Sequence, residues 1–330
     1  MKKASWKGLL ALASLSVVLL LVLAACGGDD EKEVIVFTDL DWTSGHIQTA
    51  IAAYIVENGY GYPTDRVTLA TIPGFAALET GDTQVSMEIW LPNQQAAWDK
   101  AIAEGTVKSV GSSLDDNWQS SFVIPGYTQD ANPGLVSVED LKKPEYQALF
   151  TTIETGDLAS AIGCIPGWAC EMVNEEKLVG YGLDSYVEIT NPGSGTALDA
   201  AINAAFEKQE DLLFYYWGPT QISAEKDLRI LEEPPYSDAC FDADKACADP
   251  VAQVLIAINS KLEDRAPDVV AFLEKYDFTA AAQVAAESYM GETGAEFDEV
   301  AEWFLTNNEA FWVPFVTTEA ATNVREALAG

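Results

Sequence analysis

Four of the nine tryptophans in this 330-residue chain fall at turns or at the ends of expected strands. Trp42 lies in TDLDWTSG, Trp90 in MEIWLPNQ, Trp168 in GCIPGWAC and Trp217 in FYYWGPT. Any one of them alone is explained by core packing, but four in the same topological position indicate a shared pocket. Indole faces attract cations, so a pocket of this kind would hold a cation that has no N–H donors, such as a quaternary ammonium.

The binding free energy that such a pocket can supply is comparable to the free energy of micromolar binding. Each desolvated contact between a cation and a ring contributes up to about 2 kcal/mol, and micromolar affinity needs roughly 8 kcal/mol. Three or four rings therefore supply most of that affinity. A lysine or arginine side chain would bind poorly, because the rings leave its N–H donors unpaired.

Motifs for catalysis are missing from the sequence. There is no GxSxG, no glycine-rich phosphate loop and no HExxH. FDADKACADPVAQ resembles a calcium-binding loop, but Ala246, Cys247 and Gln253 stand where a ligand, a glycine and the final acid are needed. We expect no enzyme activity, no cofactor and no metal, with a hydrolase that uses two of the many carboxylates as the alternative.

Residues 1–25 are typical of a signal peptide. A basic segment, MKKASWK, precedes the apolar LLALASLSVVLLLVL and then LAAC, which ends at Cys26. LAAC is similar to the lipobox of bacterial lipoproteins, so we expect lipidation of Cys26, a tether over 26–33 and anchoring on the outer face of the cytoplasmic membrane. A transmembrane anchor is the alternative, because the apolar run approaches spanning length.

The chain is strongly acidic, with a formal net charge of −34. Removal of the leader takes away Lys2, Lys3 and Lys7 and no acid, which changes this charge to −37. Such a charge argues against nucleic acid or anionic lipid as a partner. It fits a cationic ligand, but a well-solvated surface is the simpler explanation.

Four cysteines remain after Cys26, in two local pairs. They are Cys164, Cys170, Cys240 and Cys247. An exported chain permits disulfides, and pairing 164–170 and 240–247 is the simplest of the three possible connectivities. A zinc site is the alternative, but the chain has one histidine, His46, and no CxxC motif.

Strands and helices are expected to alternate. The segments 34–40, 66–72 and 84–90 have the composition of strands, and 46–59 has a helical apolar face that Ser44 would cap and Gly59 would end. This alternation predicts α/β architecture with a parallel, doubly wound sheet. Ligands bind at the carboxyl ends of such strands, where Trp42 and Trp90 fall.

Two extended stretches, 122–130 and 230–239, are interpreted as crossings between two lobes. Lobe 1 would then comprise 34–125 and 238–330, and lobe 2 would comprise 126–237. Residues after the second crossing, including 251–262, are expected to be mostly helical. Trp42 and Trp90 would belong to lobe 1, and Trp168 and Trp217 to lobe 2.

The motifs GCIPGWACE, MEIWLPN and FYYWGPT resemble those of glycine betaine/proline betaine substrate-binding proteins of ABC transporters, the ProX/OpuAC type. The resemblance covers about residues 34–318. It implies a two-lobed type II periplasmic-binding-protein fold that closes around its ligand at two hinge crossings. It also implies that Trp90, Trp168 and Trp217 surround a trimethylammonium group, while the backbone N–H groups of Ala169 and Cys170 bind the ligand carboxylate. The first amides of a helix suit this task, because they are unpaired and carry partial positive charge.

Two positions depart from that pattern. Gln94 stands where some members have a histidine that contacts the carboxylate, so the anion would meet a neutral donor here. Trp42 resembles the fourth aromatic of the choline-binding branch, which an acid often accompanies, and Asp41 or Asp39 could serve. His46 is expected on a helix face and not in contact with the ligand.

The sequence therefore predicts a lipid-anchored, monomeric receptor for glycine betaine or proline betaine that delivers its ligand to an ABC permease and its ATPase subunit. A choline or carnitine receptor of the same fold is the first alternative. A sugar-binding surface lipoprotein, with tryptophans as stacking platforms, is the more distant one.

Overall fold

The computed structural model describes residues 32–115 and 118–330, and from Val34 onward the chain forms one compact unit. The predicted signal peptide, the lipidation site Cys26 and most of the tether lie outside the described residues. Over the described ranges, no helix combines the length and the apolar character that crossing a membrane demands.

The first of two five-stranded sheets has the order β2-β1-β3-β10-β4. Its strands are β1 Ile35–Leu40, β2 Thr64–Leu69, β3 Val85–Leu91, β4 Val107–Ser112 and β10 Gln253–Asn259. β1, β2 and β3 are parallel, whereas β10 pairs antiparallel with both β3 and β4. This sheet with its helices is lobe 1.

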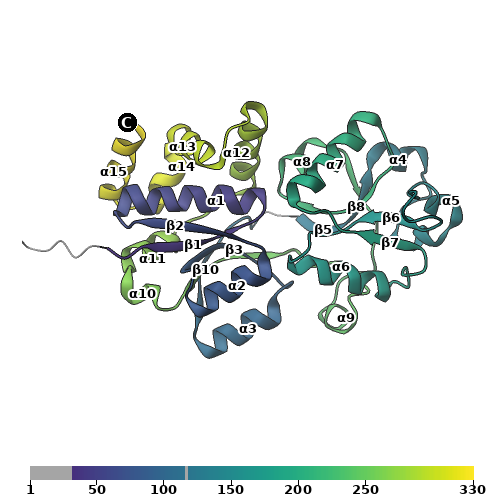
Figure 1. The fold of residues 1–330 in the computed structure, drawn as a ribbon, viewed down its shortest axis with the longest axis horizontal. Coiled ribbons are helices and arrows are strands. Elements are labelled where there is room, and N and C mark those ends of the chain that lie inside the picture. The colour runs from purple at the N-terminus through teal and green to yellow at the C-terminus, as the bar shows by residue number, and fades with distance from the viewer. Residues whose placement is uncertain (1–31, 116–117) are drawn as a thin grey trace, which may run out of the picture. The chain divides into compact units, whose positions relative to one another are not determined.

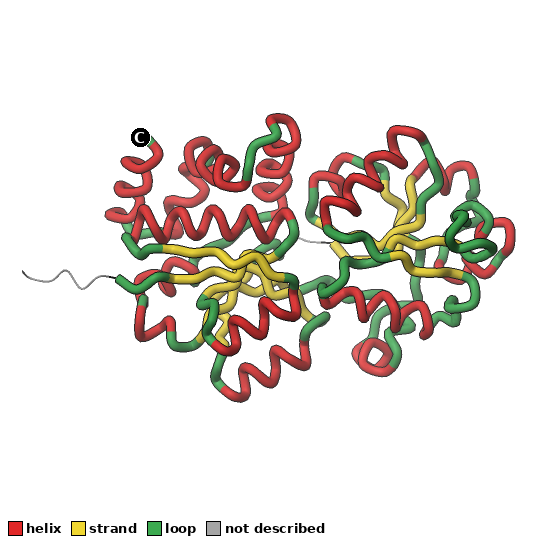
Figure 2. Tube along the Cα trace, in the orientation of Figure 1, coloured by secondary structure: helices red, strands yellow, loops and turns green. Residues whose placement is uncertain are grey.

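Helices cover both faces of the first sheet (Figures 1 and 2). α1, α12, α13 and α15 lie on one face, and α2 and α3 lie on the other. The helices of lobe 1 are α1 Thr43–Tyr54, continued by a π-helix Ile55–Gly59, α2 Thr71–Thr80, α3 Gln95–Glu104, α10 Leu262–Arg265, α11 Pro267–Leu273, α12 Ala280–Thr293, α13 Phe297–Asn307, α14 Glu309–Trp312, a 3₁₀ turn Val313–Phe315 and α15 Thr318–Leu328. The apolar face of α1 packs on the sheet and against α13, which fixes where α1 begins.

The second sheet has the order β7-β6-β8-β5-β9. Its strands are β5 Trp118–Pro125, β6 Ala159–Ile162, β7 Val187–Thr190, β8 Leu213–Gly218 and β9 Leu228–Ile230. Its helices are α4 Gly126–Ala131, a 3₁₀ turn Val138–Lys142, α5 Pro144–Gln147, α6 Ala169–Gly180, α7 Gly195–Lys208, α8 Gln221–Glu225 and α9 Asp238–Ala243. α7 and α8 lie on one face of this sheet and α6 on the other (Figure 1). This sheet with its helices is lobe 2.

The two-lobed α/β fold that the sequence predicts is confirmed, but neither sheet is purely parallel. β5 pairs antiparallel with β8 and β9, as β10 does with β3 and β4. Both strands enter their sheet directly after the chain has come from the other sheet. A strand that arrives at the carboxyl ends of its parallel neighbours has to run away from those ends, and it is therefore antiparallel.

Two segments differ from the expected secondary structure. Residues 251–262, expected to be helical, contain strand β10, and the stretch 122–130, expected to be a crossing, contains the end of β5 and most of α4. β5 therefore lies in the second sheet, although the predicted boundary at 125 assigned it to lobe 1. In β10 the apolar content reflects burial between sheet neighbours, which composition alone does not distinguish from a buried helix.

The second predicted crossing, 230–239, is confirmed only in part: β9 ends at Ile230 and α9 begins at Asp238. α9 packs against α6 and so belongs to lobe 2, whereas the predicted boundary at 237 assigned it to lobe 1. Residues 233–237 form neither helix nor strand.

The ammonium of Lys177, on α6, lies 3.0 Å from a carboxylate oxygen of Glu233 and 2.8 Å from one of Asp249, and all three side chains are buried. Tyr181 also donates a hydrogen bond to Glu233, at 2.9 Å. These contacts fasten Glu233 and Asp249, which lie on either side of α9, to α6.

Both predicted disulfides are present in the structure. Cys164 pairs with Cys170, and Cys240 pairs with Cys247. The first closes the loop that leads into α6. The second closes the loop around α9, whose Phe241 packs with Cys247 against Val173 of α6. Each disulfide is thus a local constraint at one side of the same helix.

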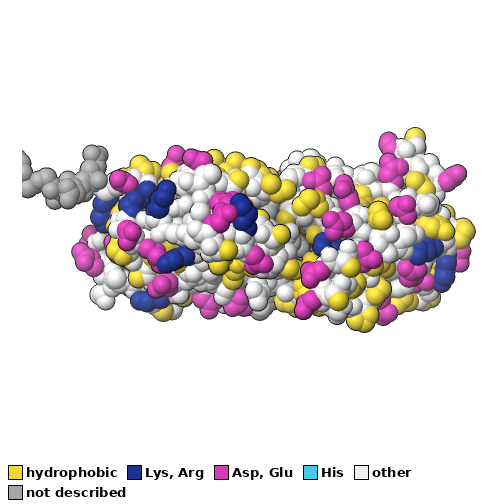
Figure 3. Space-filling model, turned by 90° about the horizontal axis from the view of Figure 1, so that it is seen from below, with side chains coloured by type: hydrophobic (Ala, Val, Ile, Leu, Met, Phe, Trp, Pro, Cys, Tyr) yellow, Lys and Arg dark blue, Asp and Glu magenta, His cyan; other side chains and the backbone are white. Residues whose placement is uncertain are grey.

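Acidic side chains are spread over the surface and do not gather in one patch on the face drawn in Figure 3. Basic side chains are fewer and lie among them. This distribution is the one expected of a well-solvated acidic surface.

Candidate functional site

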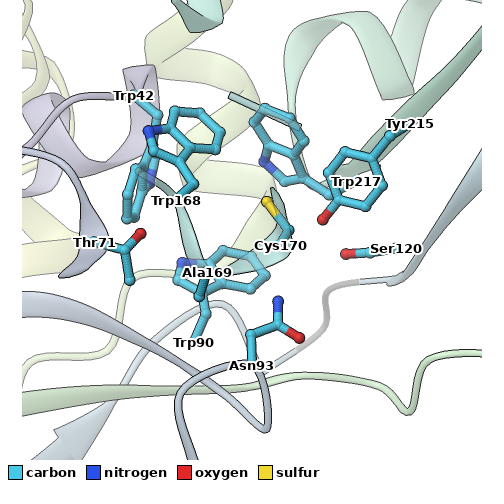
Figure 4. A pocket seen from close by; sticks show the side chains of 10 residues that line it. All are labelled: Trp42, Thr71, Trp90, Asn93, Ser120, Trp168, Ala169, Cys170, Tyr215 and Trp217. Carbon is cyan, nitrogen blue, oxygen red and sulfur yellow. The ribbon is translucent and has the colours of Figure 1, made fainter. Parts of the chain in front are cut away.

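One cavity brings together all four of the tryptophans singled out from the sequence (Figure 4). Trp42 follows β1 and is the N-cap residue of α1, and Trp90 lies near the end of β3. Trp168 is the N-cap residue of α6, and Trp217 lies near the end of β8. The strand ends of both sheets thus present their indoles to the same space.

Trp168 occupies the middle of the ring arrangement. Its ring centroid lies 5.0 Å from that of Trp42 and 5.4 Å from that of Trp217, and both pairs are edge-to-face, with interplanar angles of 67° and 73°. Edge-to-face packing is the favoured arrangement of aromatic pairs, because a positive ring edge meets a negative face. The rings therefore fix one another's orientation.

The N–H edges of three of these indoles are turned toward carboxylates. Trp42 and Trp90 donate to the same oxygen of Glu88, at 2.8 and 2.7 Å, and Trp168 donates to Asp41 at 2.6 Å. Because each N–H is already bonded at the ring edge, what the indoles offer to the cavity is carbon surface and π-electron density. That surface suits a methylated cation better than a hydrogen-bonding ligand.

Asp41 has a different place from the one expected. It is not among the residues that line the cavity, so it does not face a ligand there. Its carboxylate instead accepts the N–H of Trp168, which joins the end of β1 to the start of α6. Asp39, the other acid considered, lies 2.9 Å from the Nδ1 atom of His46 and accepts the hydroxyl of Thr68.

Glu88 is the buried group that the sequence analysis did not single out. It lies in β3, has no exposed surface, and also accepts hydrogen bonds from Ser44 at 3.2 Å and Gln48 at 2.6 Å. Burial raises the pKa of Glu88, and the four donors oppose that rise. The available signal was an acid inside the otherwise apolar strand VSMEIWL.

Ser44 does not cap α1 as predicted. The N-cap residue is Trp42, and it makes no side-chain cap hydrogen bond. Ser44 is the second residue of α1, and its hydroxyl donates a hydrogen bond to Glu88. The first turn of α1 is thus tied to β3 through a carboxylate, which is also favoured by the partial positive charge at a helix N-terminus.

Four polar residues complete the cavity wall, and none of them was predicted from the sequence. They are Thr71, Asn93, Ser120 and Tyr215. Tyr215 bonds to Ser120, and burial raises the pKa of Tyr215, so its hydroxyl keeps its proton and can donate. Tyr215 precedes Trp217 by two positions, so the two side chains leave β8 on the same face; that spacing was the usable signal.

One part of the cavity wall is formed by the start of α6. Ala169 and Cys170 line the cavity, as the resemblance implied, and the N-cap residue Trp168 supplies no side-chain cap to this turn. The loop before the helix is held by its disulfide and by Asn174, which accepts the N–H of Cys164 at 2.9 Å. A helix start fixed in this way can present amide donors to an anion.

Gln94 and His46 lie outside this cavity. Gln94 is the N-cap residue of α3 and lines a neighbouring groove that shares Asn93 and Ala169 with the cavity. Asn93 is therefore the amide that the WLPNQ segment places in the wall. His46 lies on α1, as expected, with its ring stacked 4.4 Å from Phe297.

Among the described residues that line the cavity, none carries a charged side chain. In the part of the chain that the structure describes, no group of three or more His, Cys, Asp or Glu side chains is arranged to hold a metal ion. The site thus consists of four indoles, a few neutral polar groups and one helix start.

Comparison with curated proteins finds periplasmic betaine-binding relatives. The glycine betaine-binding periplasmic protein OusX of Dickeya dadantii is 25% identical over 181 residues, which cover 53% of this chain and 52% of that protein. The chain thus spans about half the length of the curated relatives it matches.

Solved structures share the fold at low sequence identity. A choline-binding protein of an ABC transporter, in complex with choline, has a TM-score of 0.73 and 19% identity, over 89% of this chain and 98% of that one. Lactococcal OpuAC in its closed conformation with glycine betaine has a TM-score of 0.68 and 17% identity, over 87% of this chain and 100% of that one.

A family model decides the assignment. The model for the substrate-binding domain of the ABC-type glycine betaine transport system, OpuAC, matches residues 33–307, which is most of the chain. The chain belongs to the OpuAC family of ABC-transporter substrate-binding domains.

Proposed function

We propose that this protein is an extracytoplasmic receptor that captures glycine betaine or proline betaine for an ABC importer. The convergence of Trp42, Trp90, Trp168 and Trp217 on one cavity carries this proposal. A trimethylammonium group cannot donate hydrogen bonds, and indole faces attract it without needing any. No bond is made or broken, so affinity and release are the whole activity.

The helix start of α6 supports a ligand with a carboxylate. Ala169 and Cys170 lie directly after the central ring, so a short zwitterion can place its cation among the rings and its carboxylate against the first amides of α6. The hydroxyl of Tyr215 and the amide of Asn93 offer further donors in the same wall. A glycine betaine molecule satisfies both ends of such a site.

Choline is the second candidate, and two observations favour it. Trp42 adds a fourth indole to the cavity, and within residues 32–115 and 118–330 no positively charged side chain lines the wall to balance a ligand carboxylate. A ligand with a net positive charge and one hydroxyl would then bind through the same rings. Carnitine, with both a hydroxyl and a carboxylate, lies between the two.

Calorimetric titration of the protein with glycine betaine, proline betaine, choline, carnitine and a disaccharide tests the proposal. We expect saturable binding of at least one methylated amine, and the order of affinities identifies the ligand class. Binding of the disaccharide alone, or of no compound, would overturn the proposal.

The cellular context of the proposal comes from the sequence. The signal peptide and Cys26 predict export and lipid anchoring, and the loaded receptor would deliver its ligand to a permease driven by an ATPase subunit. Closure of the two lobes over the ligand would exclude water, which strengthens the attraction between the cation and the rings.

The two disulfides should differ in their effect on binding. Serine at both Cys164 and Cys170 frees the loop that carries Trp168, so we expect ligand affinity to fall by roughly tenfold. Serine at both Cys240 and Cys247 is the matched control, because that loop contributes no residue of the cavity. Each disulfide contributes about 2 kcal/mol to stability by loop closure, so the two variants should melt at similar temperatures. Equal affinities of the two variants would contradict the expected role of the first disulfide.

A further inference from the structure

We propose that Glu88 makes the cavity selective for charge, so that the site binds a trimethylammonium group in preference to a neutral group of the same shape. This inference rests on the proposed function, because it concerns the ligand of the same cavity. It assigns the selectivity to a carboxylate that does not line the cavity and that acts through the rings in front of it.

Glu88 lies behind the rings of Trp42 and Trp90. Glu88 and Trp90 are two residues apart on β3, so their side chains leave the same face of the strand. Trp42 arrives from the start of α1, and its N–H reaches the Oε2 atom that also accepts the N–H of Trp90. One carboxylate oxygen therefore sets the orientation of two rings that come from different elements.

A second feature of Glu88 is the charge of its carboxylate. An indole N–H is a donor only, so Oε2 has to accept from both rings, while Gln48 donates to Oε1. With Ser44, four donors surround the carboxylate, which matches the acceptor-only, ionised form. The surroundings are arranged for a negative charge.

A third feature is the missing counter-charge. Among the described residues, no lysine, arginine or histidine forms an ion pair with Glu88, and its side chain is fully buried. A buried charge is costly unless a charge of opposite sign lies nearby. A cation among the rings of Trp42 and Trp90 supplies that opposite sign.

The rings carry the effect from the carboxylate to the ligand. An aromatic ring has a positive edge and a negative face. A carboxylate bonded to the N–H edge holds the positive edge toward itself and leaves the electron-rich face for the cavity. The ligand cation therefore meets both the ring face and the field of the charge behind it, whereas a neutral tert-butyl group gains from neither.

The experiment compares choline with 3,3-dimethyl-1-butanol, its neutral counterpart of the same shape, by tryptophan fluorescence titration. Glu88→Gln removes the charge with little change in size. We expect choline affinity to fall by roughly 50-fold, the order produced by one charge about 7 Å away, the length of an indole, at an effective dielectric constant of about 20. Affinity for the neutral compound should stay unchanged. Ser44→Ala is the control variant, because it removes one donor to the carboxylate and keeps the charge.

The outcomes separate the two proposals. If wild-type protein binds no methylated amine, the proposed function is wrong, and this inference falls with it. If the wild type binds choline but Glu88→Gln weakens choline and the neutral compound equally, Glu88 has only a structural role and the inference is wrong. Unchanged choline affinity in Glu88→Gln overturns it as well.

A second variant keeps the test decisive if Glu88→Gln does not fold. Protonation of Glu88 removes its charge, so choline affinity should fall as the pH is lowered through the pKa of this group. Gln48→Met deletes a donor that favours the ionised form, so it should raise that pKa and move the midpoint of the affinity change to higher pH. Among the described residues, the other titratable groups around this region make no hydrogen bond to Gln48; they are Asp39, Asp41, His46, Tyr276 and Glu287. An unmoved midpoint would contradict the inference.

Discussion

Alanine in place of Trp168 is expected to lower ligand affinity by about 30-fold while the protein remains folded. One desolvated contact between a cation and an indole contributes up to about 2 kcal/mol, which corresponds to that factor. The loss should be larger than for any other single ring, because Trp168 packs edge-to-face against both Trp42 and Trp217. Calorimetric titration with the tightest-binding methylated amine measures the effect.

Two further variants interpret that result. Trp303→Ala removes an indole that lies outside the cavity and stacks on Tyr289 with a centroid distance of 4.1 Å, so it should leave affinity unchanged. Trp168→Phe should restore part of the affinity, because phenylalanine retains a ring face but loses the N–H that bonds Asp41. Full affinity in Trp168→Ala would show that this ring serves packing alone.

The second large effect concerns stability. Methionine in place of Lys177 should lower the free energy of unfolding by about 3–5 kcal/mol, because it leaves the buried carboxylates of Glu233 and Asp249 without their cation. For a protein of this size, we expect a drop in melting temperature on the order of 10 °C. Calorimetric or circular-dichroism melting curves at pH 8 measure it.

The pH dependence of that loss has a definite sign. Burial raises the pKa of Asp249 to about 6, above its usual value near 4. A carboxyl group with a raised pKa in the folded state favours folding when it is protonated, so its stabilising effect is lost as the pH rises through that value. Lys177 lowers the pKa of Asp249, so its removal raises that pKa further above 6. The difference in melting temperature between Lys177→Met and the wild type should therefore narrow as the pH is lowered from 8 toward 6.

A surface ion pair provides the control for this variant. Lys143 lies 2.8 Å from Asp140 and is half exposed. Exposed pairs contribute at most about 1 kcal/mol, so Lys143→Met should shift the melting temperature by only a few degrees. Equal shifts for Lys143→Met and Lys177→Met would show that the buried cluster does not hold the second crossing in place.

The sequence was sufficient for the rings and for the general fold. Trp42, Trp90, Trp168 and Trp217 could be grouped because residues at the carboxyl ends of neighbouring parallel strands, or at helix starts beside them, meet at one edge of a sheet. The disulfides could be paired because each pair is closed locally. These features depend on local spacing, which a sequence displays directly.

The remaining parts of the site depend on contacts between distant segments. Glu88 acquires its role from Trp42 and Gln48, which lie some 40 residues earlier in the chain. Asp41 was expected at the ligand, but it accepts the N–H of Trp168, at the start of α6 in the other lobe. Which of two adjacent amides, Asn93 or Gln94, faces the cavity depends on the turn before α3. Sequence spacing does not contain that information.

The place of β10 in the first sheet affects the order in which the protein can assemble. β4 lies at the sheet edge and has β10 as its partner strand, and β10 ends only at Asn259, whereas the strands of the second sheet all lie within residues 118–230. During synthesis lobe 2 can therefore complete its sheet first. β4 is made earlier, but it has no partner strand until β10 has been synthesised. Domains usually fold from the N-terminus onward during synthesis. In this protein lobe 1, whose N-terminal strands are synthesised first, completes its sheet after lobe 2.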